Sequence, residues 1–147
     1  MMTRVVSTIA CVMLVCTLLV FSGCGGETGE PEFEISNLDY TIVHYGRLLY
    51  TVNVTGTIRN VGTADASNVV VTGGCPSCIT MYRQREWHLI EREKVDYQKA
   101  VIRLLGRGER ANFEFQGLAY FSTGGGEIPT ELPDELEVQV MSFETAR

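Results

Sequence analysis

Apolar and polar residues alternate along most of the chain after residue 33, a period typical of strands with one buried and one solvated face. The clearest stretch has an apolar face made of Leu48, Tyr50, Val52, Val54, Gly56 and Ile58. Its polar face is made of Thr51, Asn53, Thr55, Thr57 and Arg59. A shift of one residue would bury these polar side chains, so the register of this strand is well specified. Gly56 on the apolar face indicates a bulge or a close backbone crossing.

Two shorter segments repeat the alternation, and a third is a run of three β-branched valines. Strands are predicted at residues 69–71, 111–115 and 136–140. Glycine, asparagine and proline mark turns or loops at residues 60–65, 105–110 and 124–133.

The segment of residues 87–105 fits two interpretations. Its apolar positions divide into two alternating strands, although adjacent apolar pairs with charges between them also fit a helix. We favour strands, because β-branched and aromatic residues are common here and no clear helix cap precedes them. We expect Trp87 to belong to the core and His88 to lie on the solvated face.

About seven short strands without a strong helix predict an all-β fold, an antiparallel sandwich of two sheets. We assign this domain to residues 33–147. Two segments, residues 54–71 and 104–113, also resemble the immunoglobulin-like domains of the FxLYD and CARDB type. The resemblance lies in an Asn-x-Gly turn, an Ala-x-Asn-Val strand and a Gly-Glu turn before a phenylalanine. It implies an immunoglobulin-like β-sandwich. The sequence departs from the family pattern at two points: Arg107 stands where a proline is usual in the turn, and a Cys-Pro-Ser-Cys motif is inserted.

The first residues have the layout of an export signal. Arg4 precedes an uncharged apolar stretch, residues 5–21, which ends at Ser22-Gly23-Cys24. This arrangement resembles a prokaryotic lipobox, which implies that residues 1–23 are removed and that Cys24 carries a lipid. Two alternatives remain open: an uncleaved anchor helix, since the stretch reaches the lower limit of roughly 17–25 residues for a membrane span, and simple secretion. All three place the domain outside the cytoplasm, tied to or released from a membrane.

Residues 24–32 then read as the lipidated cysteine and a short flexible tether. A tether of this length holds the domain about 15 Å from the membrane on average.

The charge of the chain excludes one class of partner. Removing residues 1–23 takes away one arginine and no acid, so the net charge falls from −6 to −7. An acidic domain is repelled by nucleic acid and by anionic lipid headgroups. We therefore expect no nucleic-acid partner.

Cys75 and Cys78 are the two cysteines left after Cys24 and the signal segment, and in an oxidising compartment they predict one disulfide. Two alternatives give this pair chemistry. A thiol–disulfide exchange site needs a helix start or a cation to acidify one thiol, and the flanking residues read as strand or loop. A zinc site needs four ligands, which His44 and His88 could complete only if the fold brought both to this turn. We expect no metal or other cofactor.

No catalytic group of residues can be argued from the sequence. The two histidines have no serine, cysteine or carboxylate partner in a recognisable arrangement, and the acids are spread along polar strand faces. We therefore predict a non-catalytic binding or structural module of the cell envelope with an envelope or surface protein as its partner. The alternative is a thiol–disulfide or metal-handling protein that acts through Cys75 and Cys78.

Overall fold

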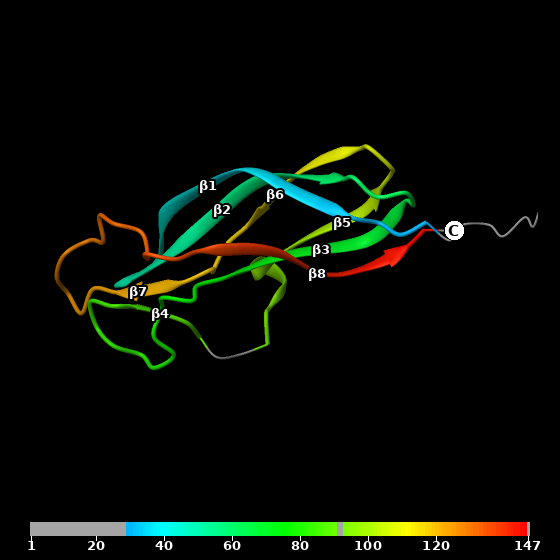
Figure 1. Cartoon of the computed structure of the whole chain (residues 1–147). Helices are drawn as coiled ribbons and strands as arrows, with labels where there is room; N and C mark the ends of the chain where they lie inside the picture. Colours follow the sequence, from blue (N-terminus) through cyan, green and yellow to red (C-terminus); the bar gives the residue numbers. More distant parts are fainter. Residues whose placement is uncertain (1–28, 91–92, 147) are drawn as a thin grey trace, which may run out of the picture.

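The computed structural model describes residues 29–90 and 93–146. These residues form two antiparallel sheets that pack face to face (Figure 1). The first sheet contains β1 (Phe33–Gly46), β2 (Leu49–Asn60), β4 (Trp87–His88), β6 (Arg110–Phe115) and β7 (Tyr120–Ser122). The second sheet contains β3 (Ala66–Gly74), β5 (Lys99–Leu105) and β8 (Glu137–Thr145). In the described ranges the helical element is one 3-10 turn, η1 (Asp96–Gln98).

The strand order is that of a two-sheet antiparallel sandwich. β2 lies between β1 on one side and β6 and β7 on the other, while β3 lies between β5 and β8. The consecutive strands β2 and β3 therefore belong to different sheets, and later strands return to pair with each of them. The predicted all-β sandwich is confirmed, with β4 and β7 as two very short strands in it.

The core lies between the facing sides of β2, β3 and β6. Val52, Val54 and Ile58 are fully buried, opposite buried valines of β3. The predicted register is thus confirmed over residues 52–58. It is wrong at the start of β2, where Thr51 is fully buried and Leu48 is half exposed. Burial of Thr51 is tolerated because its hydroxyl donates a hydrogen bond of 2.7 Å to the carbonyl oxygen of Ala119.

Gly56 marks a close approach, as the sequence suggested. A Cβ at this position would stand 2.5 Å from the ring of Phe113, which belongs to the neighbouring strand β6. The close neighbour is an aromatic side chain, so Gly56 makes room for the ring that fills this part of the core.

One end of the sandwich is closed by the Asn-x-Gly turn. The buried side-chain amide of Asn60 donates to the carbonyl oxygens of Ala64 and Leu105, at 2.8 and 3.0 Å. Its side-chain oxygen accepts a hydrogen bond of 3.0 Å from the amide of Gly62. The matching motif of the predicted family resemblance therefore has a structural role here.

The expected tether is shorter than the sequence suggested. The carbonyl oxygens of Glu30 and Glu32 accept hydrogen bonds from the amides of Thr63 and Val61, and Pro31 between them is buried. A Cβ on Gly62 would stand 2.3 Å from the backbone of this segment. Glycine is therefore the residue that lets the segment dock, and the folded body begins before Phe33.

The ambiguous segment contains a very short strand at its start and a longer one in its second half. β5 (Lys99–Leu105) confirms the second predicted strand, and β4 forms only the start of the first. The described residues between them, 89–90 and 93–98, contain loop and the turn η1. The buried side chain of Gln98 accepts a hydrogen bond from the amide of Val95 and donates one to the carbonyl oxygen of Gly117. These bonds fold the chain into a turn where alternation alone suggested extension.

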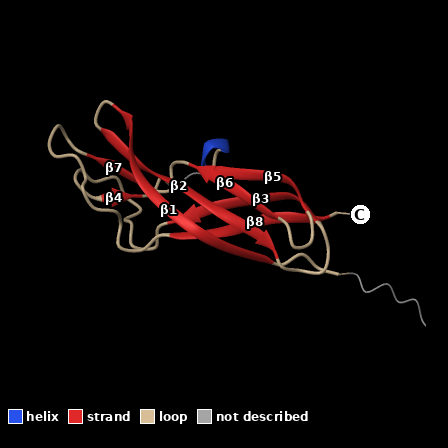
Figure 2. Cartoon of the chain, turned by 90° about the horizontal axis from the view of Figure 1, so that it is seen from above, coloured by secondary structure: helices blue, strands red, loops and turns tan. Residues whose placement is uncertain are grey.

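The two ends of the sandwich differ in their connections. The segment entering β1 and the end of β8 lie at one end, with the short turns at residues 60–65 and 106–109; we call this the terminal end. The opposite end carries the β1–β2 turn and the connections of residues 75–90 and 123–136, and we call it the loop end (Figures 1 and 2).

Candidate functional site

The loop end carries several exposed apolar side chains. Met81 is 71% exposed, Tyr82 is 62% exposed and Ile128 is 61% exposed, although all three lie in connecting segments. Seven large apolar residues are exposed at the end of β1, in the β1–β2 turn and in the two long connections: Tyr45, Leu48, Met81, Tyr82, Ile90, Ile128 and Leu132. Exposed apolar residues clustered in this way mark interaction surfaces more often than single ones do.

A groove of about 510 Å³ opens between the two long connections at this end. Such a volume lies in the range of about 300–1,000 Å³ found for ligand sites. One wall comes from the residues before β4 and the other from residues 127–134, which include two prolines. We call this feature the loop-end groove.

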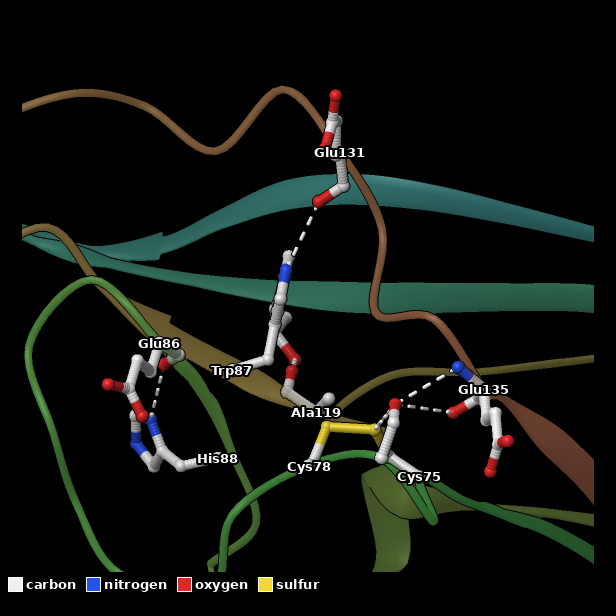
Figure 3. The surroundings of a disulfide bond; sticks show 10 residues. Cys75, Cys78, Glu86, Trp87, His88, Ala119, Glu131 and Glu135 are labelled. Atoms are coloured by element: carbon white, nitrogen blue, oxygen red, sulfur yellow. Dashed lines mark hydrogen bonds between the residues drawn. A yellow bond between two sulfur atoms is a disulfide. The ribbon is translucent and has the colours of Figure 1, made fainter.

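Two aromatic residues of neighbouring strands line the groove. Trp87 on β4 is paired with Phe121 on β7, and their ring centroids lie 5.3 Å apart. The indole nitrogen of Trp87 donates a hydrogen bond of 3.1 Å to the carbonyl oxygen of Glu131 (Figure 3). The indole therefore joins the sheet to the second wall. Trp87 also packs against the core, as predicted, and remains partly exposed.

Carboxylates dominate the charged residues of the groove. Glu86, Glu127, Glu131 and Asp134 line it together with one cation, Arg85. Glu86 forms an ion pair of 3.8 Å with Arg83, and this is the one salt bridge among residues 29–90 and 93–146. The other three carboxylates thus have no ion-pair partner in the described part of the chain, and the groove is acidic overall.

Arg85 has a strained backbone at the edge of the groove. Its φ angle is +64°, in the left-handed region that residues other than glycine rarely adopt. The conformation is held by a hydrogen bond of 2.7 Å from its amide to the carbonyl oxygen of Ser122. Backbone strain of this kind is concentrated at functional sites in proteins.

A tyrosine cluster lies beside the start of β7. Tyr45, Tyr97 and Tyr120 come from three separate segments, and the ring of Tyr45 lies 5.9 Å from that of Tyr97 and 5.8 Å from that of Tyr120. The hydroxyls of Tyr97 and Tyr120 are 3.1 Å apart. Burial raises the pKa of Tyr120 far above its usual value, and the hydrogen bond to Tyr97 is the second cause of this shift. Tyr45 and Tyr97 remain partly exposed, as tyrosines at binding surfaces often are.

The predicted disulfide is present and supports the groove. Cys75 and Cys78 are bonded at the end of β3, and both belong to the buried core (Figure 3). Between them, the hydroxyl of Ser77 accepts a hydrogen bond of 3.0 Å from the amide of Glu135. The disulfide turn is thus fastened to the connection that forms the second wall.

The disulfide lies in a buried setting away from any described helix start. Both sulfur atoms are buried, with Cys75 only 2% exposed, and no helix of the described residues begins at the pair. A reactive thiol needs access together with a helix start or a cation to acidify it.

The two histidines do not join this turn in a metal site. His44 is exposed on β1 with its ring 5.0 Å from that of Tyr50. His88 was expected on the solvated face, and this prediction is wrong because the residue is only 3% exposed. Its ring packs between Tyr82 and Tyr120, and its Nδ1 lies 3.3 Å from the carbonyl oxygen of Glu86. Among the described residues, no three potential metal ligands come together.

The predicted lipid site lies elsewhere in the chain. Cys24, the signal segment and the first part of the tether fall outside the described residues. In the part that the structure describes, no helix is long and apolar enough to cross a membrane.

Comparison of the chain with protein-family models, with curated proteins and with solved structures finds no match. The resemblance to FxLYD and CARDB domains therefore stays a prediction.

Sequence reasoning missed the groove itself. Its residues come from three segments that meet only in the fold, and for the second wall the sequence predicted only a long loop. A signal was present in the composition of the two connections. Met81, Tyr82, Ile128 and Leu132 are large apolar residues in loops, where a purely connecting segment is usually polar.

Proposed function

We propose that this protein is a membrane-tethered, extracytoplasmic binding module that presents the loop end of its β-sandwich to a protein partner of the cell envelope. Its N-terminal cysteine after processing is Cys24, which carries the lipid. The module acts by binding and not by catalysis.

The observation that carries this proposal is the polarity of the molecule. The chain enters β1 at the terminal end, whereas the groove, the tyrosine cluster and the exposed apolar loop residues lie at the loop end. At about 3.3 Å per residue, the 14 residues of β1 separate the two ends by about 45 Å. A lipid on Cys24 would hold the terminal end near the membrane and leave the loop end facing outward.

Photo-crosslinking in a bacterial host tests the binding end. A photoreactive amino acid is placed at Tyr82, in the loop end, and at Val61, an exposed apolar residue of the terminal end. We expect a protein adduct from the first position and none of similar yield from the second. Equal adducts from both positions, or no protein adduct at Tyr82, would contradict the proposal.

Lipidation is tested separately with labelled fatty acid. The full chain should incorporate the label, and Cys24→Ser should block both incorporation and removal of residues 1–23. Label entering the variant as strongly as the original chain would show that Cys24 is not the acceptor.

The alternative, thiol–disulfide chemistry at Cys75 and Cys78, is less well supported because both sulfurs are buried in the core. Insulin reduction by the full chain separates the two functions. We expect no activity above buffer, and an activity that disappears in Cys75→Ser would establish the alternative.

A further inference from the structure

The loop-end groove combines an aromatic lining with unpaired carboxylates. Trp87 and Phe121 provide flat apolar surface, and Ile128 and Leu132 extend it along the second wall. Apolar surface of this kind favours a large apolar side chain of a partner, because its burial removes both surfaces from water.

The charge of the groove selects the neighbours of that side chain. Glu127, Glu131 and Asp134 have no ion-pair partner in the described part of the chain, and Arg85 is the single cation of the groove. A partner with lysine or arginine would face a complementary potential, whereas an acidic partner would be repelled. Aromatic faces add an attraction for cations through their quadrupole.

The surroundings favour a protein segment over a small cation. Exposed apolar residues outside the groove lining, Leu48 and Tyr82 among them, flank the same end of the sandwich. A small cation would leave this surface in water, whereas a protein that inserts a segment into the groove would also cover its surroundings.

We infer that the loop-end groove is the docking site for an extended peptide segment of the partner that places lysine or arginine beside large apolar side chains. This inference rests on the proposed function and specifies the chemistry of the partner. The segment lies with its apolar side chain on Trp87 and its cations toward the carboxylates of the second wall.

The chain supplies its own probe of this groove. Trp87 is the only tryptophan, so intrinsic fluorescence reports directly on occupancy. The full chain in detergent is titrated with a short peptide of alternating lysine and leucine, which contains no aromatic residue. We expect a saturable change in Trp87 emission that weakens as salt is added, because salt screens exposed charge pairs.

Charge-neutralising variants test the assigned carboxylates. The double variant Glu127→Gln/Asp134→Asn should raise the Kd of the lysine–leucine peptide about threefold or more. The matched control Glu34→Gln/Asp39→Asn removes the same charge from exposed positions of β1, outside the groove, and should leave the Kd within about a factor of 1.5. An equal loss in both variants would assign the effect to the net charge of the protein and overturn the inference.

Three further titrations complete the test. A glutamate–leucine peptide and a lysine–serine peptide should both bind more weakly than the lysine–leucine peptide, and spermidine should fail to displace it. Equal binding by the glutamate peptide would exclude charge selection. Equal binding by the serine peptide, or displacement by spermidine, would assign the groove to small cations and overturn the inference that it docks a peptide segment.

These outcomes are separate from those of the proposed function. A protein adduct at Tyr82 without binding of the lysine–leucine peptide would retain the binding module and reject this partner chemistry. A protein that bound the peptide and formed no adduct would retain the groove chemistry and reject the envelope partner.

Discussion

The two ends of this sandwich solve the problem of chain reversal in opposite ways. At the terminal end, short turns are held by buried or ordered polar groups such as Asn60, and the amide of Arg107 donates a hydrogen bond of 2.8 Å to Asp65. At the loop end, long connections leave apolar side chains in water and hold Arg85 in a strained conformation. The first arrangement satisfies the backbone locally. The second leaves apolar side chains exposed to water and carboxylates without an ion-pair partner in the described residues. A binding surface needs such groups, because a partner can bury or pair them.

A substitution in the core, which both ends share, should have the largest effect on the free energy of unfolding. Val54 is fully buried, so Val54→Asp places an unpaired charge in the core and should lower the free energy of unfolding by about 4 kcal/mol or more. Thr57→Asp on the outer face, opposite Ser36 and Asn112, should cost about 1 kcal/mol or less. Denaturant unfolding followed by circular dichroism measures both, and equal midpoints would show that the register of β2 is wrong.

Loss of the Asn60 side-chain hydrogen bonds should give the second-largest decrease in stability, centred on the terminal end. Asn60→Ala leaves the carbonyl oxygen of Ala64 and the buried carbonyl oxygen of Leu105 without their donor and should cost about 3 kcal/mol. Amide exchange of Val61 and Thr63 should accelerate more than exchange at the loop end. Asn112→Ala, which removes an exposed side chain bonded to Thr57, is the control and should cost less than about 1 kcal/mol. Similar losses in the two variants would contradict the role of Asn60.

The disulfide should affect the loop end alone. Cys75→Ala/Cys78→Ala opens a loop of sequence separation 3, for which chain entropy predicts a loss of about 2 kcal/mol. Exchange of the Leu89 amide, which bonds to the carbonyl oxygen of Ile79, should accelerate, while that of Thr63 should not. Uniform acceleration at both ends would mean that the disulfide stabilises the whole sandwich.

The tyrosine cluster gives the smallest expected effect. Tyr120→Phe removes the bonds of the hydroxyl to Tyr97 and Gln98 and should cost about 1 kcal/mol at neutral pH. Because burial raises the pKa of Tyr120 in the folded state, its contribution is complete below pH about 10 and is lost as the pH rises above that value. The original chain should therefore lose stability more steeply than Tyr120→Phe in alkaline buffer. Parallel pH profiles would argue against burial of this phenol.

Local pattern was a good guide wherever one face was buried and the other wet. Residues 52–58 and 111–115 show this alternation, and both form strands in the predicted register. The pairing of Cys75 with Cys78 was also predictable, because these were the two cysteines left once the signal segment and Cys24 were set aside. The signal, the lipid on Cys24 and the family resemblance remain predictions.

Pattern misled where a polar group found its partner far away in the sequence. Thr51 is buried because Ala119 accepts its hydrogen bond, and residues 95–98 turn because Gln98 bonds to Gly117. His88 is buried because Tyr82 and Tyr120 enclose its ring. In each case at least one partner lies on another segment, so neighbouring residues alone do not contain the full reason.

The sequence by itself determined the class of fold, the central strand register, the disulfide and the acidic charge, since each depends on neighbouring residues or on composition. Only the tertiary structure decided that residues 30–32, before β1, dock on the Asn-x-Gly turn. It also decided that residues before β4 and after β7 meet as a groove. The physical reason is that alternation specifies which face of a strand is buried. Which loops become neighbours follows from how two sheets pack.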